Sequence, residues 1–241
     1  MRGLSRRRMR AITLKELRTY RRTTSLVVAM AIIPLVFLIQ PLASVFAVQS
    51  QGASALGRHH ELLYLLAIPA LVPATLAAYA VVGERQQGTL EPVLTTPIRR
   101  EELILAKALA VLIPSVAVAY IVFAIAIVVV ALFAHAGVAS AFIRGPDVIA
   151  QVIFTPLVAL LSIWVSMAVS TRASDIRVAQ QLSTLASLPS IAVTVLIAFD
   201  VIHPSLRVAL GFGIGLLVAN RVGWRVVSAL FDRERLIAQV R

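Results

Sequence analysis

The sequence contains no cysteine and little charge for its length. Because none of its 241 residues is a cysteine, disulfides, thiol catalysis and cysteine-ligated metal sites are excluded. Only 14% of the residues are charged, against about 25% in a typical soluble domain, and 59% are hydrophobic. A soluble chain of this composition would precipitate, so the composition predicts a membrane protein.

The sequence also lacks the short motifs of nucleotide-binding and hydrolytic proteins. The only lysines are Lys15 and Lys107, and neither follows a glycine, so no phosphate-binding loop of the GxxxxGK[ST] type is present. No GxSxG or HExxH motif occurs, and no pair of carboxylates lies inside an apolar run. We therefore expect a chain that is not an enzyme, that binds no metal or cofactor itself, and that has no energy source of its own.

Long uncharged runs divide the chain into membrane spans. A helix needs roughly 20 apolar residues to cross a bilayer, and a signal peptide has a shorter apolar core than the first run. The runs predict an all-α integral membrane protein, a single transmembrane domain over residues 1–241, with six spans at residues 23–48, 62–83, 108–134, 148–171, 178–199 and 206–222. The sixth is ambiguous, because only 13 residues separate Arg207 from Arg221. Either one of these arginines reaches toward the interface, or residues 189–207 enter the membrane again without crossing it.

The positive charge is distributed unevenly between the two sides of these spans. With six crossings, four segments lie on one side of the membrane: the N-terminal head, the 84–107 segment, the 172–177 turn, and the tail at 223–241 together with Arg221. These segments hold 20 of the 23 lysines and arginines. Such an excess marks the cytoplasmic side of a membrane protein. We therefore expect both termini in the cytoplasm, and the net charge of +12 is explained without nucleic acid.

The basic head at residues 1–22 has an amphipathic pattern. On a helical wheel one side carries Arg8, Lys15, Arg18 and Arg22, and the other carries Met9, Ile12, Leu17 and Tyr20. This pattern predicts an interfacial helix with its apolar side toward the lipid, although Glu16 falls on that apolar side. Lys107, at the cytoplasmic end of the third span, is expected to extend its side chain toward the interface.

Two further groups of polar residues have both a simple and a functional interpretation. His59 and His60 precede Glu61 in a short loop and could bind a metal, but neighbouring histidines point in different directions, so a solvated loop is the prediction. Hydroxyl residues in the fourth and fifth spans either pack helix against helix or line a substrate path: Ser162, Ser166, Ser183, Thr184 and Ser187.

The polar stretch from Glu84 to Lys107, between the second and third spans, is the one well-developed cytoplasmic segment. It contains a G-T-L-E string from Gly88 to Glu91, then Thr95 and Pro97, and then basic and acidic residues leading to Lys107. This order resembles the signature of ABC-2 type transporter permeases. The head at Lys15, Glu16 and Leu17 and the closing residues 233–236 are similar to that family as well.

The resemblance implies a transmembrane permease subunit of an ATP-driven exporter in the plasma (inner) membrane of a prokaryote. Residues 84–107 would contain a cytoplasmic coupling helix that docks on a separate ATPase, and the head would form a connecting helix. The partners would be two ABC ATPase subunits, which bind ATP and magnesium, and a second permease copy or a homologous permease. The implied ATPase contacts are Glu84, Arg85, Gly88, Thr89, Leu90, Glu91, Val93, Leu94, Thr95, Pro97, Arg99, Arg100 and Glu102.

The residues of this stretch are suited to docking. Gly88 permits a sharp turn, Thr89 can cap a short helix, and Glu91 would lie near the positive end of that helix. Leu90 and Leu94 supply apolar anchors at helical spacing. Two alternatives remain open: a non-transporting assembly factor of the same fold, and an intramembrane hydrolase that uses serine and histidine. Amphipathic drugs, lipids and lipid-linked glycans are all compatible substrates.

Overall fold

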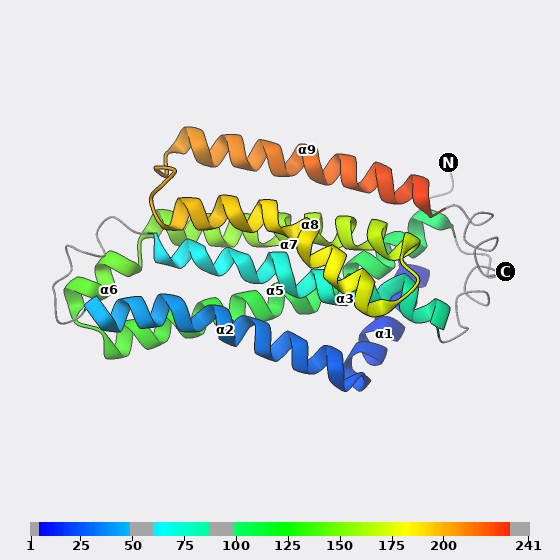
Figure 1. The fold of residues 1–241 in the computed structure, drawn as a ribbon, viewed down its shortest axis with the longest axis horizontal. Coiled ribbons are helices and arrows are strands. Elements are labelled where there is room, and N and C mark those ends of the chain that lie inside the picture. The colour runs from blue at the N-terminus through cyan, green and yellow to red at the C-terminus, as the bar shows by residue number, and fades with distance from the viewer. Residues whose placement is uncertain (1–4, 49–59, 87–98, 232–241) are drawn as a thin grey trace.

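The structure, a computed structural model, describes residues 5–48, 60–86 and 99–231. All regular elements in these ranges are helices, and the main ones lie side by side in a long bundle (Figure 1). They are α1 (Arg6–Arg22), α2 (Thr24–Val48), the 3-10 helix η2 (Glu61–Leu66), α3 (Ala67–Gln86), α5 (Arg100–Phe133), α6 (Ala136–Phe142), α7 (Gly145–Arg172), α8 (Ile176–Ala198) and α9 (Leu206–Leu230).

Six helical stretches in the described ranges are long and apolar enough to cross a membrane. The predicted all-α class with six spans is therefore confirmed. The third span is longer than expected, because α5 continues as one helix of 34 residues, or about 51 Å. Since a bilayer core is about 30 Å thick, part of α5 must extend beyond it.

The ambiguous sixth span is a continuous helix. α9 has 25 residues, or about 37 Å, and includes both Arg207 and Arg221. α8 continues through Pro189 to Ala198, and only the short turn at residues 199–205 separates it from α9. The alternative in which residues 189–207 re-enter the membrane is therefore wrong, because counting only uncharged residues underestimated the length of the last helix.

Local sequence signals explain where several helices begin. The Asp175 carboxylate accepts a hydrogen bond from the Arg177 amide at 2.6 Å, and this caps α8. The Ser205 hydroxyl accepts one from the Val208 amide at 3.2 Å and caps α9. α7 begins with a proline in its first turn, where the missing amide proton costs no helical hydrogen bond.

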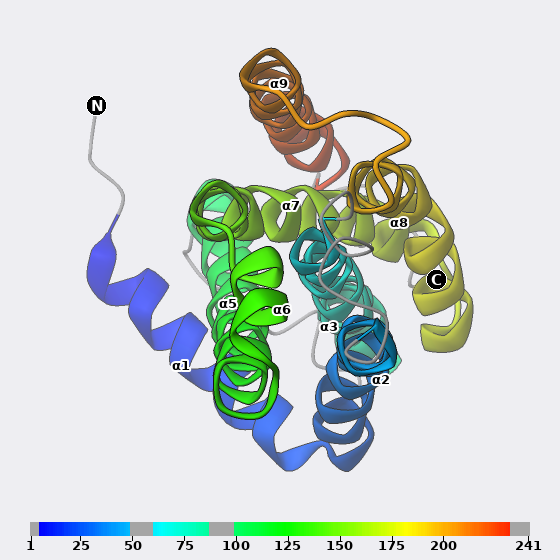
Figure 2. The same cartoon turned by 90° about the vertical axis from the view of Figure 1, so that its left-hand side faces the viewer.

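α3 is the central helix of the bundle, and α9 is the most peripheral one. In the span that contains η2 and α3, 78% of the residues are buried, whereas in the α9 span only 11% are. Viewed end-on, α3 lies among α2, α5, α7 and α8, while α9 stands outside α7 (Figure 2).

Serine hydroxyls fix α3 against α7. Ser162 donates to the carbonyl of Ala70 at 2.6 Å, and Ser170 donates to the carbonyl of Ala78 at 2.7 Å. Both pairs are separated by 92 residues, so α3 and α7 run parallel in a constant register. Small residues that allow close approach and interhelical hydrogen bonds are typical of helix packing in membranes.

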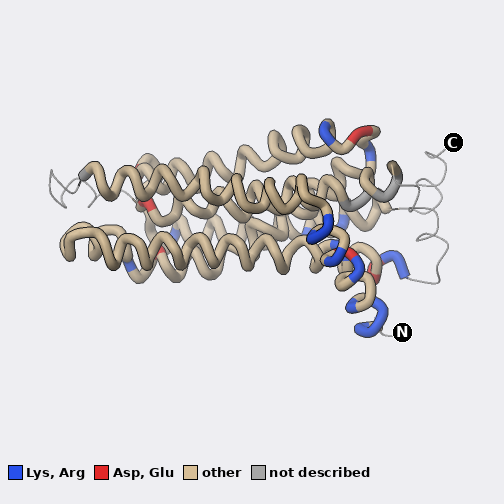
Figure 3. The backbone as a smooth tube through the Cα atoms, turned by 90° about the horizontal axis from the view of Figure 1, so that it is seen from below, with Lys and Arg blue, Asp and Glu red and all other residues tan. Residues whose placement is uncertain are grey.

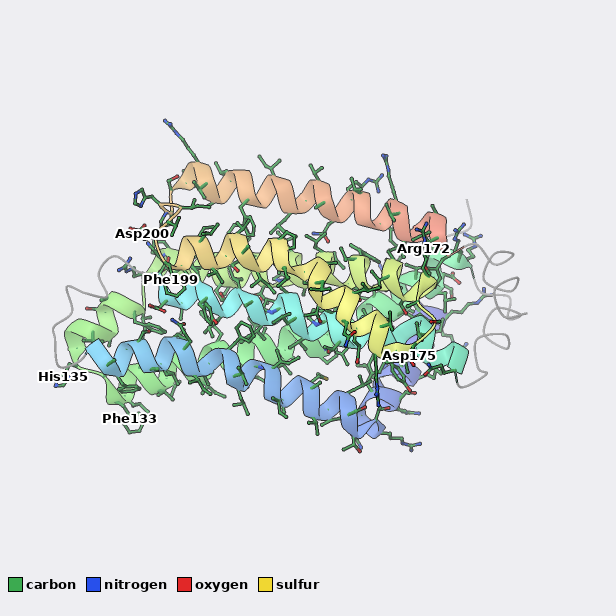
Figure 4. All side chains as sticks on the ribbon, viewed as in Figure 1. Phe133, His135, Arg172, Asp175, Phe199 and Asp200 are labelled. Carbon is green, nitrogen blue, oxygen red and sulfur yellow. The ribbon has the colours of Figure 1, made fainter. Side chains whose placement is uncertain are left out.

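The two ends of the bundle differ in charge. Figure 3 shows that most lysines and arginines of the described residues gather at the end where α1 lies. Arg172 and Asp175 lie at this end, which we call the basic end, while Phe133, His135, Phe199 and Asp200 lie at the opposite end (Figure 4). The basic end of the bundle is therefore much richer in positive charge than the opposite end.

The turn between α8 and α9 holds an ion pair outside the spans. Asp200 has a positive φ of 59°, a conformation that aspartate and asparagine tolerate better than most residues. Its carboxylate lies 2.8 Å from Nδ1 of His203. This hydrogen bond, together with the negative charge of Asp200, raises the pKa of His203 above its ordinary value.

Replacing Asp200 with asparagine is expected to lower the pKa of His203 toward the ordinary value while preserving the turn. A histidine with a raised pKa stabilises the fold at pH values below its unfolded pKa, and this contribution is lost as the pH rises through the folded pKa. The variant should lack this dependence. NMR titration of histidine-labelled protein measures the pKa, and His203→Gln identifies the signal. An unchanged pKa in Asp200→Asn would show that the pair does not form.

Candidate functional site

The predicted coupling segment joins α3 to α5 at the basic end. Glu84 and Arg85 lie in the last turn of α3, which ends at Gln86, and α5 begins at Arg100. Most of the predicted ATPase contacts lie outside the described residues: Gly88, Thr89, Leu90, Glu91, Val93, Leu94, Thr95 and Pro97. The structure therefore shows how the two flanks of the segment are held.

Glu102, a predicted contact, holds the start of α5 in place. Its carboxylate accepts a hydrogen bond from the Arg99 amide at 3.3 Å and so caps the first turn. It also accepts one from the Ser5 amide at 2.7 Å and lies 3.9 Å from a guanidinium nitrogen of Arg8. The first turn of α5 is thus bonded to the N-cap and the first turn of α1.

Arg100, another predicted contact, keeps part of its hydrogen-bonding capacity unused. Its Nε and one Nη are buried from solvent, yet no residue in the described ranges accepts a hydrogen bond from them. An arginine has five donors in a fixed fork and is always charged. These two nitrogens therefore lack an acceptor among the described residues.

Two turns further along α5, a buried ion pair joins it to α1. The ammonium of Lys107 lies 3.5 Å from a carboxylate oxygen of Glu16, and the two side chains are only 1% and 6% exposed. The same oxygen lies 3.2 Å from the ammonium of Lys15, whose side chain is 53% exposed. The Thr13 hydroxyl adds a hydrogen bond to the carbonyl of Ala106 at 3.1 Å.

These contacts correct two predictions. Lys107 does not extend toward the interface, because α1 covers it and supplies the carboxylate that a buried ammonium requires. The apolar side of α1 does not face lipid alone: Tyr20 is buried and Leu17 is half-buried, and both belong to the cluster that includes core residues of α5. Glu16 is accommodated on this side of α1 because its ion-pair partner, Lys107 of α5, packs against it.

Both members of the pair stand out in the sequence, but nothing in the sequence connects them. Glu16 was the exception on the apolar side of the head, and Lys107 was the one lysine beside a span. Because a charge on a buried face needs an opposite charge, the two exceptions were the available signal. The sequence alone does not show that the head packs against α5 near Lys107.

The predicted path-lining hydroxyls lie between α3, α7 and α8. Ser162 bonds to α3 and lies 3.4 Å from the hydroxyl of Ser187, which donates to the carbonyl of Ser183. Thr184 donates to the carbonyl of Gln180 on its own helix. The hydroxyls of Ser166 and Ser183 are buried, and no described group bonds to them. Most of these contacts are packing contacts, and a substrate path along them stays a prediction.

At the opposite end the predicted solvated loop is wrong for His60 and Glu61. Nδ1 of His60 lies 2.9 and 3.0 Å from the two carboxylate oxygens of Asp147, and Nε2 lies 3.4 Å from Arg144. Glu61 is buried and accepts a hydrogen bond from the Gln40 amide at 3.1 Å. Asp147 and Glu61 lie in the first turns of α7 and η2, so these polar residues hold helix ends together.

The two-histidine metal site considered from the sequence cannot be followed as a pair, because His59 lies outside the described residues. Within residues 5–48, 60–86 and 99–231, no three histidine, aspartate or glutamate side chains come together in a way that could hold an ion. His60 is instead occupied by Asp147 and Arg144. The cluster therefore serves to hold helix ends together.

The fold and the joint at the basic end define a multi-pass membrane protein with six spans and a helical head locked onto the third span. The family model of the ABC-2 type transporter matches residues 7–210. The chain belongs to this family, as the signature at residues 84–107 indicated, and it is thus a membrane component of a transporter. No curated protein matches the chain closely.

Proposed function

We propose that the chain is the permease subunit of an ATP-driven exporter that couples to separate ATPase subunits through residues 84–107. The observation that carries this proposal is the joint between α1 and the start of α5. Glu102 bonds to the start of α1, and Lys107, about one and a half turns further along α5, pairs with Glu16. A force applied at the N-terminal end of α5 would therefore move α1 and α5 together.

The mechanism follows from the positions of the two helices that flank the segment. α3 lies at the centre of the bundle against α7 and α8, and α5 extends beyond the length that a bilayer requires. When two partner ATPases close on ATP and magnesium, they would push the segment, and α3 and α5 would transmit the push as rigid bodies. Access to a path between two permease copies, identical or homologous, would then alternate.

The orientation is part of the same proposal. The basic end, with the head and Arg172, would face the cytoplasm of a prokaryote, with both termini inside, because cytoplasmic segments are rich in lysine and arginine. The ATPases would dock at this end and hydrolyse ATP there, so the chain itself would need neither a nucleotide nor a metal. Arg100 would offer its buried nitrogens to an acceptor on the partner.

Replacing Glu91 with arginine is expected to prevent ATPase docking. An opposite charge at the predicted helix end should weaken binding by about 30-fold or more, as at an interface hot spot, and abolish ATP-driven efflux. Leu94→Arg should do the same by placing a charge on an apolar anchor. The measurements are co-purification with a phosphate-loop ATPase encoded beside the gene, and efflux from liposomes that contain both proteins.

The matched control is Leu206→Arg, which introduces the same charge at a leucine that is 76% exposed at the start of α9. This variant should still bind the ATPase, because it lies at the opposite end of the bundle. Unchanged binding and efflux in Glu91→Arg would refute docking through residues 84–107. ATPase binding without any efflux of amphipathic substrates in the unmodified protein would instead favour a non-transporting assembly factor.

A further inference from the structure

An apolar groove of about 680 Å³ runs between α7 and α9 on the outside of the bundle. Its α7 wall includes Val165, Ala168 and Val169, and its α9 wall includes Gly215 and Val218. The groove faces away from α3, the central helix, so it belongs neither to the joint at the basic end nor to the serine contacts in the core. It needs a separate explanation.

The groove exists because α9 touches α7 along a narrow line of contacts. Phe154 packs edge-on against Phe212 at a centroid distance of 5.2 Å, and the Asn220 amide donates to the carbonyl of Leu157 at 3.0 Å. Beside this line α9 has no side chain at Gly215, where an added Cβ would meet no atom within 4 Å. The space next to the contact line therefore stays open.

Toward the basic end a second hollow, between the end of α7 and the start of α8, adjoins the groove at Val169. This hollow of about 320 Å³ is lined by Val169, which also lines the groove, and by Arg172 and Ser174. Arg172 is exposed, and no residue within the described ranges bonds to its guanidinium. Arg225, next to the groove-lining Val226, is exposed at the same end of α9.

We propose that this groove binds one phospholipid of the bilayer, with an acyl chain along α7 and α9 and an anionic headgroup at Arg172. The groove offers an acyl chain an apolar surface without competing polar groups. Arginine presents a fork of donors that matches phosphate oxygens, and each basic residue near the surface attracts anionic lipid. The apolar part and the charged part lie in the order in which a lipid presents its tail and its head.

Charge also argues against a second copy of the chain as the occupant. Every copy in one membrane has the same orientation, so an approaching copy would bring its own basic end against Arg172 and Arg225. Such like-charge contacts are unfavourable. An anionic lipid neutralises these charges, whereas a second copy would add to them.

The test uses the full-length protein in nanodiscs with a phosphatidylglycerol that carries a photoreactive acyl chain. Crosslinks are expected at residues 161–169 and 215–226, above the level at α2, whose Ile39 is 64% exposed. Gly215→Leu fills the groove and should remove this excess. Gly211→Leu is the matched control, because it adds the same side chain one turn away, where space is also open but outside the groove.

A second pair of variants tests the headgroup. Arg172→Gln should reduce the labelling by phosphatidylglycerol about fivefold, to the level of phosphatidylcholine, because one basic residue is lost. Arg177→Gln, an exposed arginine in the same turn that does not line the hollow, should leave the preference intact. Uniform labelling of all lipid-facing helices, or unchanged labelling in Gly215→Leu, would overturn the proposal. So would a loss of dimer in Gly215→Leu with unchanged labelling, since the groove would then be an interface between copies.

Discussion

Replacing Lys107 with methionine is expected to destabilise the protein by about 3–5 kcal/mol. The substitution keeps most of the apolar volume but leaves the Glu16 carboxylate buried without its buried partner. The ammonium of Lys15 stays 3.2 Å away, but it lies on an exposed side chain and compensates the buried charge only in part. An uncompensated buried charge is far more costly than the pair itself. Equilibrium unfolding in mixed micelles measures this loss.

Three further variants separate the pair from the side chains that form it. Lys15→Met removes an exposed charge from the same carboxylate and should change the free energy of unfolding by about 0.5 kcal/mol or less. Glu16→Leu combined with Lys107→Met removes both charges and should recover most of the stability lost in Lys107→Met alone. Equal losses in Lys15→Met and Lys107→Met would mean that Lys107 is not buried by α1.

Replacing Gly223 with leucine is expected to displace α9 from α7 and to destabilise their contact by about 1–3 kcal/mol. A Cβ at this position would lie 2.8 Å from the Cβ of Trp164, an atom close to the backbone that cannot rotate away. The displacement should break the hydrogen bond from Asn220 to the carbonyl of Leu157. The span with the smallest buried share, 11%, would then lose a close contact with α7.

The two tryptophans of the chain report this change directly. Trp164 and Trp224 are the only ones, and they face each other edge-on at a centroid distance of 5.4 Å. Gly223→Leu should therefore change the intrinsic fluorescence as well as the stability. Gly211→Leu is the control, since its Cβ meets open space and both properties should be preserved. A native-like spectrum and stability in Gly223→Leu would show that the helices do not approach this closely.

Hydrophobic run length and charge placement predicted the class of the fold from the sequence alone. Each span is a local property of about 20 residues, so no knowledge of its neighbours is needed. The family, too, could be inferred from one contiguous stretch, because its order of residues is read along the chain. The sixth span was less certain since Arg207 and Arg221 lie on one continuous helix, and a charge near a helix end does not end the helix.

The pairings between distant residues could not be predicted in the same way. Glu16 and Lys107 are 91 positions apart, and His60 and Asp147 are 87 apart. Which helices become neighbours depends on the packing of the whole bundle, and a single sequence carries no direct record of it. At the candidate site the flanks of the coupling segment are now located, whereas the docking role of Glu91 and Leu94 stays a prediction.

The separation of Glu16 from Lys107 also has a consequence for biogenesis. Synthesis proceeds from the N-terminus, so the pair cannot form until the chain has been made as far as residue 107 and the third span has begun to enter the membrane. Until then the basic head can only be held at the surface of the membrane by its arginines. The ion pair between α1 and α5 therefore forms late in synthesis. An arrested chain that ends before Lys107 would leave the head without this contact.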